Sequence, residues 1–191
     1  GDLFSLLHTF DEDLQWDHKL KILSDIAKGM ACLHGHDPII MHRDLKSMNL
    51  LLPNRYSQER LPCVKVSDFG SCRTQDGNVD VGWETLTRCV GTSPWMAPEV
   101  PSGRYNHKAD VYSFGIVMFE ILAQELPFEG EEMSAVPGLA LAGNRPDLEA
   151  ISPEVSDKVL KLLLGSWVTN PAKRPSFSAV LQVISEFEGL P

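Results

Sequence analysis

The spacing of apolar residues along the chain predicts several helices. From Asp17 to Leu33, apolar residues recur every three or four positions, which indicates a long amphipathic helix with Asp17 as its N-cap. The segment Asp110–Leu122 is apolar on most sides, so it should form a buried helix. Ser152 and Pro153 suit the cap and first turn of another helix, and a last helix is expected from Pro175 to about Phe187.

Three short apolar stretches between these helices predict short strands. They are Ile39–Met41, Leu50–Leu52 and Val64–Val66, and each is bounded by polar or turn-forming residues. The stretch from Ser71 to Pro94 has little periodicity and carries three glycines, so we expect a long exposed loop there. The chain should therefore be mainly α with a few short β-strands.

Composition limits the classes of function that need to be considered. The 191 residues are 43% hydrophobic and 23% charged, which is typical of one globular domain. A net charge of -9 gives no electrostatic support for a nucleic-acid partner. The four cysteines show neither a Cys-x-x-Cys pair nor the spacing of a zinc site, which favours a reduced, cytoplasmic setting. The sequence contains no apolar stretch long enough for a membrane span and no signal peptide.

A charged loop, His42–Asn49, lies between the first two predicted strands and reads "HRDLKSMN". Its Asn49 amide, together with Asp68 after the third strand, offers the oxygen ligands that Mg²⁺ prefers. The carboxylate of Asp44 is then free to accept a proton from a hydroxyl group. Lys46 can contact a phosphoryl group during its transfer as a point charge. Together these residues suit phosphoryl transfer, in which positioning and charge neutralisation carry most of the catalysis.

The order of the motifs adds a family resemblance to this chemistry. The segments "HRDLKSMN", "DFG" (Asp68–Gly70) and "APE" (Ala97–Glu99) follow one another in the contexts that protein kinases require. Further segments match as well: "GDLFSLLH", "ADVYSFGIVMFEIL" and "NPAKRPSF". Residues 1–191 resemble the C-terminal lobe of a eukaryotic-type protein kinase, from the hinge region to the end of the lobe. The resemblance implies a kinase-like fold, mainly α with short β-strands.

The resemblance implies a role for each residue of the charged loop. Asp44 would accept or orient the hydroxyl proton of the substrate, and Lys46 would stabilise the γ-phosphoryl group of ATP. Asn49 and Asp68 would hold Mg²⁺. Leu51 would pack under the adenine from the lower lobe.

The resemblance also implies structural roles. His42 and Phe69 would stack in the column of side chains that links the two lobes. Asp110 would hydrogen-bond the backbone of the catalytic loop. It could also be the N-cap of the buried helix, and the two roles are compatible. Glu99 and Arg174 would form a buried ion pair, and removal of one partner would cost about 3–5 kcal/mol.

Two assignments stay open between a functional and a plain structural interpretation. Asp2 matches a position where some kinases contact the ribose, but it equally suits a solvated helix cap. Arg43, beside Asp44, could receive a phosphate from the long loop, with Thr85 and Thr87 as candidate phosphosites or as ordinary loop hydroxyls. Cys72, after the "DFG", is expected to be an inert loop cysteine rather than a reactive thiol.

Several residues resemble those of one branch of the family. Lys46 followed by Ser47 resembles serine/threonine-directed kinases, and Thr92 in "GTSPWMAPEV" would hydrogen-bond near Asp44 and Lys46. The "WMAPEV" segment and Trp167 resemble the tyrosine-kinase-like group in particular. These residues imply a kinase that acts on serine or threonine hydroxyls of protein substrates. Met48 stands where some kinases have an acidic residue that reads basic substrates.

The chain lacks the parts of a kinase that cover the nucleotide. It has no G-x-G-x-x-G loop and no strand lysine, so we expect an N-terminal lobe upstream and a fragment that is inactive alone. The apolar face around Leu51 and Phe69 should then be exposed. A second hypothesis, from another class, is a non-catalytic interaction module that keeps this lobe as a scaffold. The parent protein of either kind could be anchored to a membrane.

Overall fold

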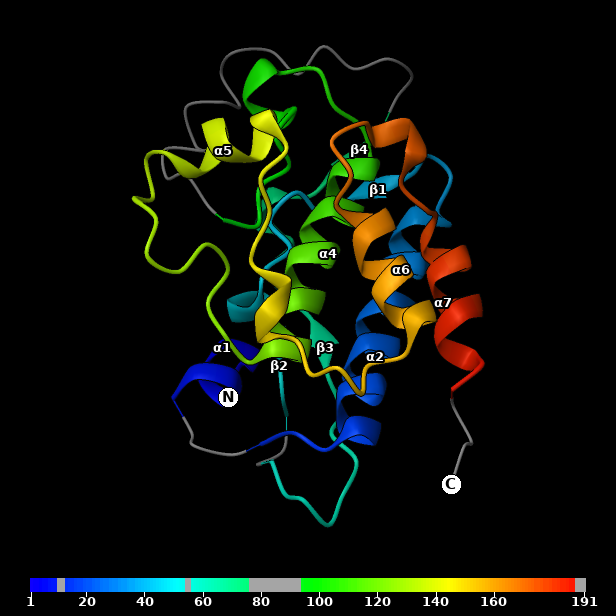
Figure 1. The fold of residues 1–191 in the computed structure, drawn as a ribbon. Coiled ribbons are helices and arrows are strands. Elements are labelled where there is room, and N and C mark those ends of the chain that lie inside the picture. Colours follow the sequence, from blue (N-terminus) through cyan, green and yellow to red (C-terminus); the bar gives the residue numbers. More distant parts are fainter. Residues whose placement is uncertain (10–12, 54–55, 76–93, 188–191) are drawn as a thin grey trace.

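Helix α4 forms the centre of the fold in the computed structural model, which describes residues 1–9, 13–53, 56–75 and 94–187. It contacts α6, which contacts α7, and α2 contacts both α4 and α7. In Figure 1, α6 and α7 lie on one side of α4, whereas α1 and α5 lie on the other. The helices are α1 (Leu3–His8), α2 (Trp16–His34), α4 (Lys108–Ala123), α5 (Val136–Ala142), α6 (Asp157–Ser166) and α7 (Phe177–Ser185). Within the described ranges, no helix is long and apolar enough to cross a lipid bilayer.

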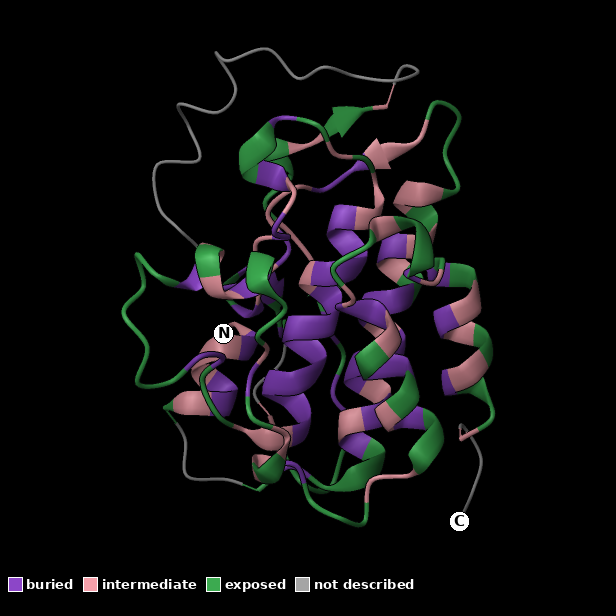
Figure 2. Cartoon of the chain, turned by 45° about the horizontal axis from the view of Figure 1, so that its top comes forward, coloured by how far each residue is buried: buried purple, intermediate pink, exposed green. Residues whose placement is uncertain are grey.

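The burial of α4 confirms the helix that its apolar sequence predicts. Every residue from Ala109 to Leu122 except Ser113 is buried, and Figure 2 shows the helix buried along nearly its whole length. Gly115 lies where the end of α6 crosses this helix. A Cβ atom at Gly115 would lie 3.1 Å from the Cβ of Ser166 and 3.2 Å from the Cβ of Trp167. The missing side chain therefore allows α6 to approach α4 closely.

Helix α2 is the predicted amphipathic helix, but its cap was placed wrongly. The helix begins at Trp16, and Gln15, in an extended conformation, occupies the N-cap position. Asp17 lies inside the first turn, where its side chain accepts a hydrogen bond from the backbone of His18 at 3.0 Å. A carboxylate in the first turn is still favourable, because it faces the positive end of the helix dipole.

The start of α6 corrects another predicted cap. The N-cap is Ser156, whose hydroxyl accepts from the backbone N–H of Val159, so the helix begins four residues after Pro153. Ser152 instead closes a turn in which its carbonyl accepts from the backbone of Val155 at 3.1 Å. The helix depends on burial of Val159, Leu162 and Leu163, and Ser156 precedes that apolar stripe by three residues. The last predicted helix is confirmed as α7, with Ser176 as its N-cap.

The strands form two antiparallel pairs that frame the charged loop. Strand β1 (Ile40–Met41) pairs with β4 (Arg73–Thr74), and β2 (Leu50–Leu51) pairs with β3 (Lys65–Val66). Three of them confirm the predicted strands, each one residue shorter at one end. Strand β4 lies within the segment that was predicted as a loop. Its two polar, exposed residues carry no apolar alternation, so only the pairing with β1 reveals it.

Short 3₁₀ helices complete the described fold and include the end of the charged loop. Five of them are present: Ser47–Asn49, Phe69–Ser71, Val100–Ser102, Leu148–Ala150 and Pro171–Lys173. The turn Ser47–Asn49 leads directly into β2, and its first and last residues are buried. A fold that is mainly α with short strands is thus confirmed, and its strands place the charged loop between β1 and β2.

Candidate active site

Three of the predicted site residues meet within the charged loop. The Lys46 ammonium donates to both carboxylate oxygens of Asp44, at 3.0 and 2.8 Å. The Asn49 side-chain amide donates to the backbone carbonyl of Asp44 at 2.8 Å and to its carboxylate at 3.0 Å. The side chains of Lys46 and Asp44 remain 26% and 31% exposed, so a substrate can reach them. The loop thus presents an accessible carboxylate in a fixed position beside a cation.

Asp68 is connected to this loop through the pairing of β2 with β3. The residue before it, Ser67, donates from its backbone N–H and its hydroxyl to the carbonyl of Asn49, at 2.9 and 2.8 Å. Asp68 itself adopts a left-handed backbone conformation with φ of 61°. Such a conformation is costly for a residue other than glycine and often occurs at functional sites.

The side-chain oxygen atoms of Asn49 and Asp68 suit a magnesium ion. Asn49 uses its amide nitrogen to bind Asp44, so its Oδ1 oxygen is the atom that it can offer to a metal. Asp68 adds a carboxylate, and one carboxylate with few other protein ligands is typical of Mg²⁺ sites that also bind phosphate. Within the described ranges there is no cluster of three or more His, Cys, Asp or Glu side chains, which a zinc-type site would require.

Asp110 holds the beginning of the charged loop from α4. Its buried carboxylate accepts from the backbone N–H groups of His42 and Arg43, at 2.9 and 2.8 Å. These hydrogen bonds are the ones expected from the sequence. Asp110 is, however, not the N-cap of the helix, because that position belongs to His107.

His34 is a partner of Asp110 that the sequence did not indicate. Its Nε2 atom lies 2.8 Å from the Asp110 carboxylate, and the two residues are 76 positions apart. His34 is the last residue of α2. No local pattern could predict the contact, because it depends on how α2 packs against α4.

Arg43 has an unusual backbone and an unpaired side-chain atom. Its φ of 71° lies in the left-handed region, and the hydrogen bond to Asp110 helps to hold this conformation. Its buried Nε atom has no hydrogen-bond partner among the residues described. Thr85, Thr87 and Thr92 lie outside the described residues, so their predicted roles stay predictions.

His42 and Phe69 contact each other, and part of this contact faces solvent. Their ring centroids are 5.6 Å apart, and the Nε2 atom of His42 lies 2.9 Å from the carbonyl of Ser67. Phe69 is 53% exposed and Leu51 is 43% exposed. The exposed apolar face expected around Leu51 and Phe69 is therefore present in this chain.

Asp2 acts as a helix cap in this structure. Its carboxylate accepts from the backbone N–H of Ser5 at 2.8 Å, at the start of α1. The residue also forms an isolated β-bridge with Leu51, which places it beside β2. The cap interpretation is thus confirmed, while the ribose contact stays a prediction.

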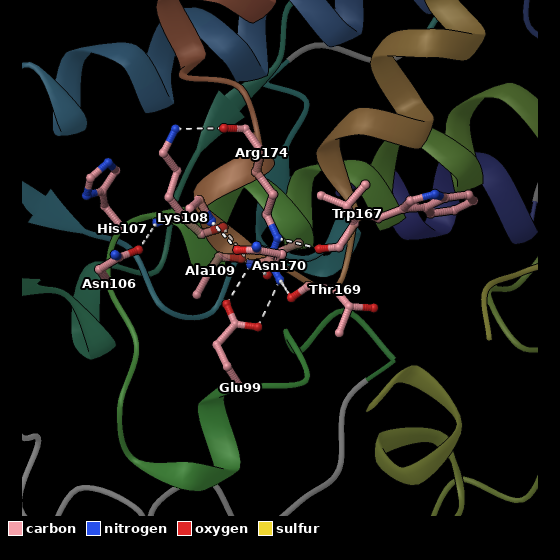
Figure 3. Close-up of polar contacts among 12 residues, drawn as sticks. Glu99, Asn106, His107, Lys108, Ala109, Trp167, Thr169, Asn170 and Arg174 are labelled. Atoms are coloured by element: carbon pink, nitrogen blue, oxygen red, sulfur yellow. Dashed lines mark hydrogen bonds and ion pairs between the residues drawn. The ribbon is translucent and has the colours of Figure 1, made fainter. Parts of the chain in front are cut away.

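The predicted ion pair between Glu99 and Arg174 is present and bidentate (Figure 3). The two N–O distances are 2.5 and 2.9 Å. The Arg174 side chain is completely buried and that of Glu99 is 15% exposed. Arg174 also donates to the carbonyl oxygens of Val168, Lys108 and Thr169, so its guanidinium group is well satisfied.

Two further features were not predicted around this pair. The Lys108 ammonium donates to the carbonyl groups of Arg174 and Pro175, and burial, followed by the charge of Arg174, lowers the pKa of Lys108. The ring of Tyr112 lies 5.1 Å from the guanidinium carbons of both Arg145 and Arg174. Burial raises the pKa of the Tyr112 phenol.

Glu120, a buried acid on α4, is the main polar residue that the sequence interpretation missed. Its carboxylate lies within hydrogen-bond distance of His8 (3.0 Å), Ser47 (2.8 Å) and Trp95 (2.5 Å). Burial raises the pKa of this carboxyl group, and these hydrogen bonds act in the opposite direction. A single acid within the apolar run Phe114–Ala123 is a signal that could have indicated a paired, buried carboxylate.

Cys72 lies close to the charged loop but has the surroundings of an inert thiol. Its sulfur is 3.8 Å from the carbonyl of His42. Burial raises the pKa of Cys72, with further contributions from Asp110 and Asp68 and an opposing one from Arg43. A raised pKa reduces the thiolate fraction, which is the reactive form of cysteine.

Comparison with known proteins gives matches along almost the whole chain. The family described as protein tyrosine and serine/threonine kinase matches residues 1–184. Cyclic GMP-binding protein C of Dictyostelium discoideum is 34% identical over 193 residues, which covers 98% of this chain and 7% of the relative. A putative serine/threonine-protein kinase/receptor, R826, of Acanthamoeba polyphaga mimivirus is 37% identical over 188 residues, covering 98% of this chain and 10% of the relative.

A third relative has a larger share of its length in the match. The probable serine/threonine-protein kinase drkC of Dictyostelium discoideum is 38% identical over 183 residues, which covers 95% of this chain and 23% of the relative. The chain therefore spans less than a quarter of each of these three relatives.

Proposed function

Because the chain belongs to the protein tyrosine and serine/threonine kinase family, we propose that it is the catalytic lower lobe of a protein serine/threonine kinase. The reaction would transfer the γ-phosphoryl group of ATP to a serine or threonine hydroxyl of a protein substrate. The observation that carries this proposal is the arrangement of Asp44, Lys46 and Asn49 in an accessible loop, where Lys46 and Asn49 both donate hydrogen bonds to Asp44.

The chain's own residues suggest how the transfer would proceed. Asp44 would accept or orient the proton of the attacking hydroxyl, because its carboxylate is partly exposed and is held by hydrogen bonds from Lys46 and Asn49. Lys46, already beside Asp44, would neutralise charge that develops on the transferred group. Asp110 would keep the loop in place through its two bonds to the backbone.

Nucleotide and metal would bind beside this loop. Asn49 Oδ1 and the Asp68 carboxylate would hold Mg²⁺, which would neutralise phosphate charge when ATP is bound. Leu51 would contact the adenine through its exposed side chain. Asp2 lies beside Leu51, so a ribose contact remains part of the proposal even though its carboxylate caps α1.

The proposed serine/threonine specificity rests on residues of the catalytic loop and on the relatives. Lys46 and Ser47 suit serine/threonine specificity, and two of the relatives are named as serine/threonine-protein kinases. The "WMAPEV" segment and Trp167 support the tyrosine-kinase-like group. We further propose a cytoplasmic location for this domain. We also propose regulation in which Arg43 binds the phosphate group of phosphorylated Thr85 or Thr87.

Substitution of Asp44 provides the test of this function. The protein should be expressed with its natural upstream sequence and assayed for transfer of labelled phosphate from ATP to protein serine and threonine. We expect Asp44→Asn to lower kcat by roughly 10²–10⁴-fold, because it removes the proton acceptor. Glu149→Gln, at an exposed acid far along the chain, is the control and should keep the wild-type rate. The 191-residue chain alone should show no useful turnover.

Two results would contradict the proposal. An Asp44→Asn protein as active as the wild type would show that the loop does not work as proposed. A wild-type protein that has an upper lobe but transfers no phosphate would favour the non-catalytic scaffold.

A further inference from the structure

We propose that Glu120 is a positioning residue, which fixes the catalytic loop His42–Asn49 in register with the segment that leads to Glu99. The consequence for phosphoryl transfer rests on the function proposed above. The structural part, that one carboxylate joins two loop segments, stands on its own contacts.

One buried side chain on α4 links segments that are far apart in the sequence. The Oε1 atom of Glu120 accepts from the Ser47 hydroxyl and lies 3.0 Å from Nε2 of His8, the last residue of α1. Its Oε2 atom accepts from the indole N–H of Trp95. Ser47 belongs to the catalytic loop, and Trp95 lies two residues before Ala97.

Burial makes each of these hydrogen bonds necessary. Glu120 and Ser47 are completely buried, Trp95 is 6% exposed, and the His8 side chain is 10% exposed. A buried carboxylate is costly unless hydrogen-bond donors satisfy its oxygens, and these side chains are the donors that the structure provides. The two segments are therefore held in a common arrangement by the same group.

The neighbours of Ser47 connect this contact to the chemistry. Ser47 directly follows Lys46 and begins the 3₁₀ turn that ends at Asn49. A shift of Ser47 would therefore move both Lys46 and Asn49. Misplacement of catalytic groups by about 1 Å can lower a rate about 100-fold, so the position of this turn matters.

A second contact from α4 holds the other segment. The hydroxyl of Ser113 donates to the carbonyl of Trp95 at 2.7 Å, so α4 binds both the backbone and the side chain of Trp95. Ser113 and Glu120 are seven residues apart and lie on the same face of the helix. This polar face of an otherwise apolar helix is therefore directed at the two segments that Glu120 connects.

The test compares two substitutions at position 120 with a matched control. Glu120→Met keeps a side chain of similar size but leaves Ser47 and Trp95 without an acceptor. Glu120→Gln keeps one acceptor oxygen for Trp95, and its amide can donate to Ser47, so it should restore much of the contact. Ile121→Met introduces the same residue at the next position of the same buried helix and leaves the hydrogen bonds intact.

The first readout is local and needs no enzyme activity. In the 191-residue chain, Glu120→Met should raise amide hydrogen exchange at both 46–49 and 96–99 by roughly fivefold to tenfold, the effect of one lost hydrogen bond. The indole N–H resonance of Trp95 should move upfield in NMR spectra. The amide exchange rates in α7 should change no more in Glu120→Met than in Ile121→Met. In Glu120→Gln, the exchange rates at 46–49 and 96–99 should stay close to those of the wild type. If only one of the two segments loosens, or neither does, Glu120 does not join them.

The second readout is kinetic and uses the longer protein with its upstream sequence. Glu120→Met should lower kcat by roughly 10-fold to 100-fold relative to Ile121→Met, with Glu120→Gln recovering most of the rate. Equal kcat values for Glu120→Met and Ile121→Met, despite looser segments, would show that the contact has no positioning role in catalysis. An inactive wild type would overturn the proposed kinase function, while the exchange experiment would still decide whether Glu120 connects the segments.

Discussion

At the scale of single residues, polar side chains of α4 hold the charged loop His42–Asn49 in place. Asp110 binds the backbone at the beginning of the loop, and Glu120 binds Ser47 near its end. Asp44 and Lys46 themselves are partly exposed and bind mainly each other. The residues proposed to act are therefore accessible, and the residues that hold the loop are buried.

Tyr112 on the same helix gives a prediction about a buried hydroxyl. Its oxygen is buried and has no hydrogen-bond partner among the residues described. Tyr112→Phe should therefore leave the free energy of unfolding unchanged or raise it by up to about 1 kcal/mol, as measured by urea denaturation. Tyr56→Phe is the control, because it removes a hydroxyl 2.8 Å from Nδ1 of His18 and should cost about 1 kcal/mol. A larger loss for Tyr112→Phe than for Tyr56→Phe would contradict this interpretation.

At the scale of elements, helix starts show how a sequence pattern can mislead. Ser152–Pro153 has suitable residues for a cap, yet α6 is capped by Ser156. Both serines are acceptable locally, and the choice is made by the apolar stripe beginning at Val159 that α6 buries.

The two serines therefore provide a matched pair of substitutions. Ser156→Ala should lower the free energy of unfolding by about 0.5–2 kcal/mol, because the backbone N–H of Val159 loses its acceptor. Ser152→Ala should cost clearly less, since its hydroxyl only supports an exposed turn at Glu154. Chemical denaturation of the two variants measures the difference. Equal losses would mean that α6 does not depend on the Ser156 cap.

The ion pair between Glu99 and Arg174 gives the second prediction at this scale. Glu99→Gln removes one charge and leaves a fully buried guanidinium without its counter-ion, so we expect a loss of about 3–5 kcal/mol. Glu186→Gln breaks an exposed ion pair, in which the side chain of Glu186 is 47% exposed and that of Lys158 is 66% exposed. This substitution should cost less than about 1 kcal/mol. Thermal or urea unfolding of both variants tests this. A loss at Glu99 no greater than that at Glu186 would show that the buried pair contributes little.

At the scale of the whole molecule, pH should act on stability through His107. Burial lowers its pKa below the ordinary value of 6.5, with help from His34 and Lys108 and opposition from Asp110. The unfolded chain then binds a proton at this residue before the folded chain does. Stability should therefore fall as the pH decreases through the ordinary value toward the folded pKa.

His107→Gln should make the dependence of stability on pH shallower between about pH 7.5 and 5. The replacement can still donate from its side chain to Gln75, which His107 contacts at 3.0 Å. His36→Gln, the same substitution at an exposed histidine, is the control. Urea denaturation at several pH values provides the measurement. The same slope in the wild type and in His107→Gln would exclude His107 as its source.

Most of the architecture could be predicted from the sequence, because periodicity is a local property. The spacing of apolar residues predicted α2, α4 and α7, and short apolar runs predicted three strands. The order of the loop motifs predicted that Asp44, Lys46 and Asn49 would lie together, as the hydrogen bonds show.

The contacts that the sequence missed depend on tertiary packing. His34 meets Asp110 and Glu120 meets Trp95 only because distant segments converge on α4. Strand β4 was missed for the same reason, since its polar residues become a strand only by pairing with β1. Spacing along a chain reports which face of an element is apolar, but it does not report which distant side chain satisfies a buried polar group.

The close crossing at Gly115 has a consequence for how relatives of this chain should be compared. An added Cβ atom there would lie 3.1 Å from Ser166 and 3.2 Å from Trp167, so these neighbours would have to move by a few tenths of an ångström to accept it. This close crossing favours glycine for the packing of α6 on α4, independently of any catalysis. Retention of the central helix across lineages would therefore record shared architecture, whereas loss of the proposed catalysis would first be visible as substitutions at Asp44 and Asn49.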